Sequence, residues 1–359
     1  MKARFDKLRL SLVAILLGFL LGAVIVLATG ESPMDMVNAM FRGFTGINLA
    51  AGTFNPRLVG EFILQSLPIL LTGLSVGFAF RTGLFNIGAE GQVMMGSIAA
   101  TAAALLVQAP RAIHLPVVLL SAMAAGAVWG AIPGFLKARF NIHEVVVTIM
   151  LNHTAFHLNN YAVLSIFGSV DRIKTEPFAE TALLHSPFLE SITNGSRLHW
   201  GFVPVILAIL VYWFVINKTT FGYSLRATGF NREAARCAGM KVERNMVLSM
   251  MIAGAFAALA GAIMTVGTFS FGRALPAAEG YGFDGIAVAL VGGNEAVGIL
   301  LAGLLFGMLK AAQPLMQSAG IPMEIAGIIQ ASIVLFVAMK YGIEGIFRRA
   351  ARKAKGAAP

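Results

Sequence analysis

Apolar runs of about twenty residues recur along this chain, and they constrain its fold more than any other feature. Apolar residues make up 57% of the 359 residues, whereas charged residues make up only 12%. Because soluble domains carry about 25% charged residues, this deficit of charge indicates segments that lie in lipid. We therefore expect an all-α, polytopic membrane helix bundle that forms a single transmembrane domain over residues 1–359.

We expect about ten spans with both termini in the cytoplasm. The first covers residues 10–29, which is longer than the apolar core of a signal peptide and has no Ala-x-Ala cleavage site after it. The other segments are 58–80, 84–108, 115–136, a polar one from 142, 200–216, 245–271, 280–293, 296–316 and 323–340. Short or broken helices are expected near 84–92 and 280–293, where glycines flank or interrupt the apolar residues.

The formal net charge is +10, and the basic residues lie mainly at span ends. Placing the termini, Arg81, 137–139 and 218–244 in the cytoplasm puts most of the 27 Lys and Arg on that side, as the positive-inside rule requires. A basic cytoplasmic tail, 341–359, follows the last span. Membrane topology explains this charge better than a nucleic-acid partner does, so none is expected.

The longest cationic interruption is 218–244, which separates two apolar spans and carries six Lys or Arg against two Glu. Glu233, Ala234, Ala235 and Gly239 lie at its centre, and small residues of this kind permit close approach of another surface. The single cysteine of the chain, Cys237, also lies here and can form no intramolecular disulfide. We expect a helical cytoplasmic loop that docks a partner.

The sequence carries no recognisable catalytic or metal-binding motif. There is no Gly-x4-Gly-Lys-Ser/Thr loop for ATP, and His143-Glu144 lacks the second His of a zinc-protease helix. His153 and His157 lie one turn apart without an acidic or thiol ligand nearby, so hydrogen-bonded histidines are favoured over a metal site. We therefore expect no cofactor and no ATPase site in this chain.

Charged groups in spans are costly and therefore need a partner or water. Glu61, Lys310 and Glu324 are expected to reach the headgroups from span ends. Asn86 and Glu90 are four residues apart, which predicts one helical face for both, with Gln92 pointing elsewhere. Two interpretations stay open for this glycine-rich entry to a span: an irregular segment that lines a water-filled path, and a buried hydrogen-bond cluster.

The span that begins near residue 142 is the most polar. At about 100° per residue, one arc holds Glu144, Thr148, Asn152 and Asn159, and the opposite side holds His153, His157 and Asn160. A span that is polar on two faces is expected inside the bundle rather than against lipid. In one interpretation its polar arc lines a conduit for a hydroxylated solute. In the other, the same side chains only pack against neighbouring helices.

At the basic loop the sequence resembles the permease subunits of bacterial ABC importers, whose signature Glu-Ala-Ala-x-x-x-Gly is matched by the residues 233–239. The stretches 81–92, 141–152 and 280–293 are similar to nucleoside and simple-sugar permeases of the ribose/branched-chain amino acid group, although His143 stands where an Asn is commoner. The resemblance covers roughly 58–340.

This resemblance implies a multi-pass permease of the bacterial inner membrane that pairs with a second related permease. A partner ATPase, often a tandem, would bind ATP and Mg, and a solute-binding lipoprotein of the basic-membrane-protein type would deliver a nucleoside or a simple sugar. A short helix over 231–240 would carry the ATPase-coupling residues Glu233, Ala234, Ala235 and Gly239. The residues expected along the translocation path are Asn86, Glu90, Glu144, Asn152 and Asp284.

An ion-coupled secondary transporter remains the alternative. In that case Glu90, Glu144 or Asp284 would serve as the proton or sodium site.

Overall fold

The computed structural model describes residues 2–48, 51–168 and 170–339, and these residues are almost entirely helical. The helices are α1 Lys2–Ala28, α2 Pro33–Thr45, α3 Pro56–Arg81, α4 Ala89–Leu106, α5 Arg111–Phe140, α6 Glu144–Tyr161, α7 Pro187–Ile192, α8 Phe202–Lys218, α9 Thr220–Phe230, α10 Arg232–Cys237, α11 Val242–Ile263, α12 Tyr281–Val291, α13 Ala296–Ser318 and α14 Glu324–Ala338. The π-helical turns Ala162–Ile166 and Met264–Phe269 extend α6 and α11, and a 3-10 turn covers Glu180–Ala182. A hairpin pairs β1 Ile47–Asn48 antiparallel with β2 Thr53–Phe54. The all-α expectation is confirmed.

Six of the described helices are long and apolar enough to cross a membrane, and a seventh crossing results if the bent pair α8 and α9 is counted. The six are α1, α3, α4, α5, α11 with its π-helical extension, and α13. α12 and α14 are shorter apolar helices, and α6 is too polar to meet this criterion. The chain is therefore a multi-pass membrane protein, while the expected count of about ten spans stays a prediction. The predicted tail, 341–359, lies outside the described residues.

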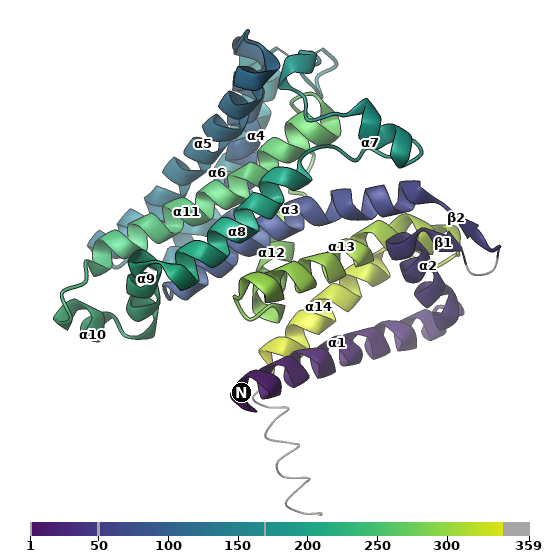
Figure 1. The fold of residues 1–359 in the computed structure, drawn as a ribbon, viewed down its shortest axis with the longest axis horizontal. Helices are drawn as coiled ribbons and strands as arrows, with labels where there is room; N and C mark the ends of the chain where they lie inside the picture. The colour runs from purple at the N-terminus through teal and green to yellow at the C-terminus, as the bar shows by residue number, and fades with distance from the viewer. Residues whose placement is uncertain (1, 49–50, 169, 340–359) are drawn as a thin grey trace, which may run out of the picture.

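Helix α3 lies at the centre, between two groups of helices (Figure 1). On one side it contacts α11, which packs on α4 and α5; on the other it contacts α12 and α13. Almost all of α3 from Phe62 to Ala79 is buried, and Gly73 and Gly77 allow Val288 and Ile299 to pack against its backbone. Because α3 touches both groups along much of its length, it is the main element that joins them, beside smaller contacts of α4 with α12 and of α8 with α13.

Glycines at every fourth position of α5, namely Gly126, Gly130 and Gly134, allow a close contact with α11. A Cβ at Gly126 would collide with the backbone of Gly254, and one at Gly130 would collide with the carbonyl oxygen of Met250, both in α11. Such small residues allow helix backbones to approach closely in a membrane. The α5–α11 pair is accordingly the most extensive helix contact in the described chain.

One end of the bundle, which we call the coupling face, gathers the segments that were predicted to share a side. It comprises the start of α1, the ends of α3, α5, α8 and α12, and all of α9 and α10. The hydroxyl of Ser11 donates to the Val291 carbonyl at 3.4 Å, and Arg81 donates through Nε to the Asn294 carbonyl at 2.9 Å. α1 and α14 run antiparallel, since Gly18 faces Ile333 and Gly22 faces Ile329. The assignment of this face to the cytoplasm stays a prediction.

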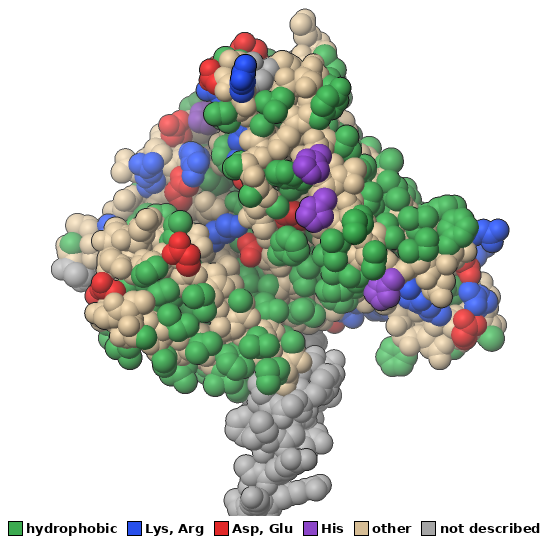
Figure 2. Space-filling model, turned by 180° about the vertical axis from the view of Figure 1, so that it is seen from behind, with side chains coloured by type: hydrophobic (Ala, Val, Ile, Leu, Met, Phe, Trp, Pro, Cys, Tyr) green, Lys and Arg blue, Asp and Glu red, His purple; other side chains and the backbone are tan. Residues whose placement is uncertain are grey.

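The opposite end, which we call the outer face, carries α2, the hairpin, α7 and the irregular segment 270–280 (Figure 1). Between α1 and α3 the chain forms α2 and the hairpin. Ser32 caps α2, Pro33 begins it and Gly46 ends it in the left-handed conformation, as these residue types favour. Between the two ends, broad areas of hydrophobic side chains are exposed (Figure 2).

Candidate functional site: the coupling helix and the inner polar segments

The predicted docking loop forms two short helices, and α10 carries the motif. Asn231 caps α10 by accepting from the Ala234 amide at 3.0 Å, and Ala235 is buried against α11 and α9. Glu233 and Ala234 are exposed, and Gly239 ends the turn at φ +79° with open space where a Cβ would stand. The motif therefore combines one anchoring alanine with a free, small-residue surface.

Arg236 links α10 to the start of α11. Its guanidinium binds Glu233 at 3.0 Å and Glu243 at 2.6 Å, and these carboxylates, Glu243 first, raise the pKa of Arg236. These exposed ion pairs connect α10 to the start of the helix that follows it.

Phe230, between α9 and α10, was missed by the sequence reasoning. Its side chain is 97% exposed, more than any other large hydrophobic side chain in the described chain. An isolated exposed aromatic beside a docking helix is the type of residue that anchors protein interfaces. An aromatic directly before the cap residue of the motif was the available sequence signal.

The coupling loop also touches the turn between α3 and α4. Arg232 donates to the Gly83 carbonyl at 3.3 Å, and a Cβ on Gly83 would lie 3.1 Å from the Cα of Gly229. Gly83 has φ +71°, a conformation that glycine adopts without strain. This turn, 83–88, is thus in contact with the docking loop at one end and with α4 at the other.

Asn86 lies inside this turn and is completely buried. It donates to Ser75 at 3.2 Å and to Gln92 at 2.9 Å, and Gln92 donates back at 3.3 Å. The prediction that Asn86 and Glu90 share a helical face with Gln92 pointing elsewhere is wrong, because α4 begins only at Ala89. In the single chain Asn86 forms the buried hydrogen-bond cluster that was one of the two open interpretations.

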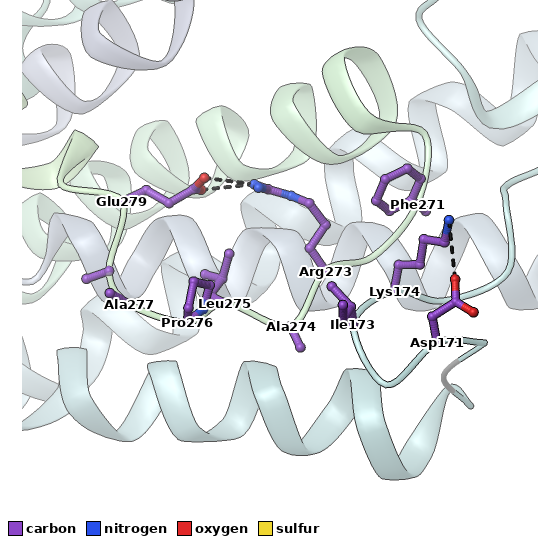
Figure 3. Close-up of a pocket in the computed structure, with 11 residues that line it drawn as sticks. Asp171, Ile173, Lys174, Phe271, Arg273, Ala274, Leu275, Pro276, Ala277 and Glu279 are labelled. Atoms are coloured by element: carbon purple, nitrogen blue, oxygen red, sulfur yellow. Dashed lines mark hydrogen bonds and ion pairs between the residues drawn. The ribbon is translucent and has the colours of Figure 1, made fainter. Parts of the chain in front are cut away.

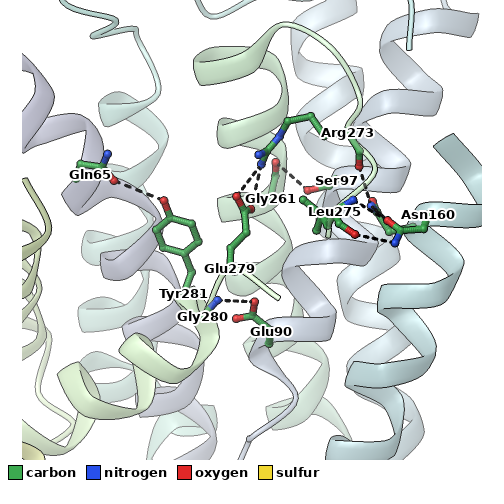
Figure 4. Close-up of polar contacts among 11 residues, drawn as sticks. Gln65, Glu90, Ser97, Asn160, Gly261, Arg273, Leu275, Glu279, Gly280 and Tyr281 are labelled. Atoms are coloured by element: carbon green, nitrogen blue, oxygen red, sulfur yellow. Dashed lines mark hydrogen bonds and ion pairs between the residues drawn. The ribbon is translucent and has the colours of Figure 1, made fainter. Parts of the chain in front are cut away.

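Glu90 is 3% exposed and binds the beginning of α12. One carboxylate oxygen accepts from the Gly280 amide at 2.9 Å and the other accepts from the Gly282 amide at 2.6 Å (Figure 4). Free amides at a helix start attract negative charge. Gly282 packs against the Glu90 backbone so closely that a Cβ there would collide with it. Glu90 therefore joins the two short helices that the sequence predicted separately.

Asp284 lies one turn into α12 and forms an ion pair with Lys310 of α13 at 3.1 Å. The Lys310 ammonium also lies 3.7 Å from the ring centre of Tyr281. Lys310 was expected to reach the headgroups; instead it neutralises Asp284, because a paired charge is less costly in a membrane. Asp284, in α12, thus pairs with α13, whereas Glu90, in α4, binds the backbone at the start of α12.

The polar arc of α6 holds the same turn from the other side. The Asn152 amide group donates to the Ile87 carbonyl at 3.0 Å and accepts from the Gly91 amide at 2.8 Å. Glu144 forms an ion pair with Lys137 at 3.0 Å near the coupling face. The structure therefore brings Asn86, Glu90 and Asn152 around one turn and leaves Glu144 and Asp284 at its periphery.

The opposite side of α6 does not lie inside the bundle of this chain, contrary to prediction. α6 packs on α4 and α5 at the edge, and its other side is exposed. His153 and His157 stand on that side among Met150, Leu158 and Tyr161. The buried side holds Thr148 and Asn159, so the two-sided polar pattern was identified correctly but only one side is covered.

The outer face carries an open pocket of about 630 Å³ beside the irregular segment 270–280 (Figure 3). Phe271, Leu275 and Pro276 supply apolar walls, while Lys174 and Arg273 supply charge. Backbone hydrogen bonds join the loop around Lys174 to segment 270–280. The Thr175 amide donates to the Gly272 carbonyl at 2.9 Å, and the Ala274 amide donates to the Ile173 carbonyl at 2.7 Å.

Arg273 is the central polar residue of this pocket. Its guanidinium binds Glu279 at 3.0 Å and lies 3.4 Å from the ring centre of Phe269 (Figure 4). The Arg273 carbonyl accepts from Asn159 at 2.9 Å, and Asn160 both donates to and accepts from Leu275. Arg273 and Glu279 also border a smaller cavity that contains Glu90 and Tyr281. Arg273 and Glu279 therefore lie between the pocket on the outer face and the small cavity at Glu90.

These features define a class of protein: a helical membrane protein with an exposed docking helix at one end and a polar, irregular segment opening at the other. The family model described as "Branched-chain amino acid transport system / permease component" matches residues 58–338, and the chain belongs to this family. The match agrees with the predicted extent of the resemblance.

Three relatives resemble the chain over most of its length. The guanosine ABC transporter permease protein NupP of Bacillus subtilis is 47% identical over 98% of this chain and 99% of the relative. The nucleoside ABC transporter permease protein NupB of Lactococcus lactis is 35% identical over 98% and 96%. The glucose ABC transporter permease protein TsgB13 of Haloferax volcanii is 33% identical over 90% and 85%.

Proposed function

We propose that this chain is the permease subunit of an ATP-driven importer that translocates nucleosides across the bacterial inner membrane. The observation that carries the proposal is its similarity, over nearly its whole length, to permeases named for guanosine and for nucleosides. The permease named for glucose is less similar, which places a simple sugar second.

In this proposal a partner ATPase binds ATP and Mg and docks on α10. The exposed Glu233 and Ala234 would lie against the ATPase, and Phe230 would enter an apolar groove on it. ATP-driven closure of the ATPase would then move α10, and the Arg236 link to Glu243 would pass this movement to α11. The permease itself would perform no hydrolysis.

The turn 83–88 provides a second route for the movement. Arg232 contacts it at Gly83, Asn152 holds it to α6, and Glu90 binds the amides at the start of α12. We assign to this connected set the role of relating the position of the coupling loop to that of segment 270–280, because each element in it is bonded to the next.

The pocket at segment 270–280 has the chemistry to receive a nucleoside. Phe271 offers an aromatic face of the kind on which bases stack, and Arg273 and Glu279 offer hydrogen-bond partners for hydroxyl groups. A solute-binding lipoprotein on the outer face would deliver the solute to this entrance. Specificity would then reside mostly in the lipoprotein.

The uncovered side of α6 is the surface that we assign to a second, related permease. Imidazole groups at membrane depth face protein or water more favourably than lipid. With His153 and His157 exposed in a single chain, a facing permease or a shared aqueous path between two permeases would satisfy them.

The direct test is uptake into proteoliposomes that contain this chain, its ATPase and its second permease, with the lipoprotein outside. We expect labelled guanosine to enter only with ATP inside, and glucose not to compete. Uptake that persists without ATP and stops when ion gradients collapse would overturn the proposal in favour of the ion-coupled transporter.

Docking is tested with Glu233→Lys and Gly239→Asp, which alter the exposed surface of the coupling turn. Both variants should insert normally but lose ATPase association and uptake. Glu176→Lys, an equal charge change at an exposed site on the outer face, is the matched control. Normal co-purification and normal uptake of the two variants would refute the docking assignment.

A further inference from the structure

A second cavity, of about 280 Å³, lies on the outer face between α2 and the end of α13. Asp35, Asn38 and Arg42 line it from α2, and Leu315 and Ser318 line it from α13. None of these residues lines the pocket beside segment 270–280 or takes part in the coupling contacts described above. The cavity therefore requires an explanation of its own.

Arg42 is the unusual member of the lining. Its Nε atom is buried, and no described residue accepts a hydrogen bond from it. Within the described parts of the chain, neither Arg42 nor Asp35 forms an ion pair. A buried donor without an acceptor is destabilising, and a guanidinium is permanently charged. The site thus lacks an anion that would complete it.

The polar side of α2 matches a ligand with two opposite charges. Asp35 and Arg42 are seven residues apart, nearly two turns, so they lie on the same side of the helix and about 10 Å apart along its axis. Asn38 lies between them and offers both a donor and an acceptor. A phosphate at Arg42 and an amine at Asp35 are the charges that fit this arrangement.

The rest of α2 shows where such a ligand would come from. Met36, Ala39, Met40 and Gly43 form its buried side, which packs on α13 and α3. A separate apolar stripe is exposed and borders the polar side directly at about 100° per residue; it consists of Met34, Val37, Phe41 and Phe44. A helix with this pattern lies at the boundary between headgroups and acyl chains.

A second exposed apolar surface lies on α1, which is in contact with α2. α1, which contacts α2 and α14, exposes a row of leucines, among them Leu16, Leu20 and Leu27. Acyl chains along α1 and the α2 stripe would place their headgroup beside the cavity. A lipid therefore satisfies the polar and the apolar observations together, which a free phosphate does not.

We propose that this cavity binds the headgroup of a zwitterionic aminophospholipid from the leaflet on the outer face. Its phosphate is held by Arg42 and its primary ammonium by Asp35, while its acyl chains lie on the exposed stripe of α2. The lipid phosphate provides an acceptor for the buried Nε atom of Arg42, and the bound lipid fixes α2 against α13.

The test is native mass spectrometry of the full-length permease purified in detergent and supplied with phosphatidylethanolamine, phosphatidylglycerol or phosphatidylcholine. We expect phosphatidylethanolamine to be retained, and Arg42→Gln and Asp35→Asn each to reduce its occupancy about tenfold, the loss expected for about 1.4 kcal/mol. Arg57→Gln, an exposed arginine near the same end of the bundle, should leave the occupancy unchanged.

Each alternative outcome has a defined meaning. Equal retention of phosphatidylglycerol or phosphatidylcholine would refute the pairing of Asp35 with an amine. Inorganic phosphate that raises the Tm of the lipid-free protein as much as the lipid does, in an Arg42-dependent manner, would replace the lipid site with a phosphate site. If Arg42→Gln is poorly folded, Asp35→Asn and Val37→Ser decide, because both positions are exposed; unchanged retention in both would overturn the proposal.

Discussion

Two irregular segments precede helices in this bundle, and they differ in how they are covered. Segment 83–88 leads into α4 near the coupling face and is held by Asn86, Gln92 and Asn152 in a closed network. Segment 270–280 leads into α12 at the outer face and borders a pocket of about 630 Å³. Each segment interrupts the helical structure, but one is covered and the other borders a pocket. We call segment 83–88 the packed joint and segment 270–280 the open wall.

The two segments are connected at a single residue. Glu90, two residues after the first segment, accepts hydrogen bonds from Gly280 and Gly282 at the end of the second. This contact suggests that a movement of the joint is transmitted to the wall. Four changes test the comparison, in order of decreasing expected effect on transport.

The largest effect is expected from Gly83→Ala in the packed joint. The added Cβ would lie 3.1 Å from Gly229 and the residue has φ +71°, so both the coupling contact and the backbone would be disturbed. Uptake should fall to background. Gly195→Ala has a similar φ of +79° but open space around it, and proteoliposome uptake should stay near that of the unmodified protein. Equal uptake by both variants would show that the contact is unimportant.

Glu90→Gln, at the connection, should reduce uptake about tenfold, equivalent to about 1.4 kcal/mol. The carbonyl oxygen of Gln still accepts a hydrogen bond but its NH2 group can only donate, so one of the two backbone amides at the start of α12 loses its acceptor. The matched control is Glu61→Gln, whose partner Arg197 is half exposed. Uptake and Tm are measured together; a lowered Tm with normal uptake would assign Glu90 to stability alone.

Arg273→Gln acts only on the open wall and should have a smaller effect. Loss of the ion pair with Glu279 and of the contact with Phe269 alters the pocket without touching the coupling face. We expect a several-fold rise in the KM of uptake at unchanged ATPase rate; Arg172→Gln, at an exposed site that does not line the pocket, is the control. A change in ATPase coupling with normal KM would show that Arg273 acts in the coupling movement and not at the entrance for the solute.

Lowering the pH should destabilise the outer face, whereas at neutral pH its stability and transport should be unaffected. His199 is fully buried, accepts from the Gly201 amide at 3.0 Å, and burial, with a minor contribution from His185, lowers its pKa to about 4. Because the unfolded chain then binds the proton more readily, stability is unchanged above about pH 6.5 and falls as the pH is lowered toward about 4. The Tm between pH 7.5 and 4.5 measures this effect, and His199→Gln should flatten the profile.

The exposed coupling loop offers one further comparison, between two of its aromatic residues. Phe230 is 97% exposed and Tyr223 is 61% exposed, so neither contributes much to the fold. Phe230→Ala should weaken ATPase association measured by co-purification, whereas Tyr223→Ala should not. Equal behaviour of the two variants would exclude an aromatic anchor at position 230.

The sequence by itself determined the helical class, the approximate positions of the six long apolar helices and the Glu-Ala-Ala-x-x-x-Gly motif, whose role in docking stays a prediction. Hydropathy is additive along a segment, and the motif residues 233–239 are contiguous, so neither depends on distant contacts. The prediction of one helical face for Asn86 and Glu90 failed for a local reason: the glycine-rich run before Ala89 is not helical.

Only the tertiary structure decided which polar groups meet. Glu90 and Gly282 are separated by 192 residues, Lys310 and Asp284 by 26, and no periodicity relates either pair. The exposed side of α6 and the cavity beside α2 were likewise invisible in the sequence, because burial depends on which helices pack together. A charge within a membrane requires a partner, which the sequence indicates; the identity of that partner depends on the packing of the whole bundle.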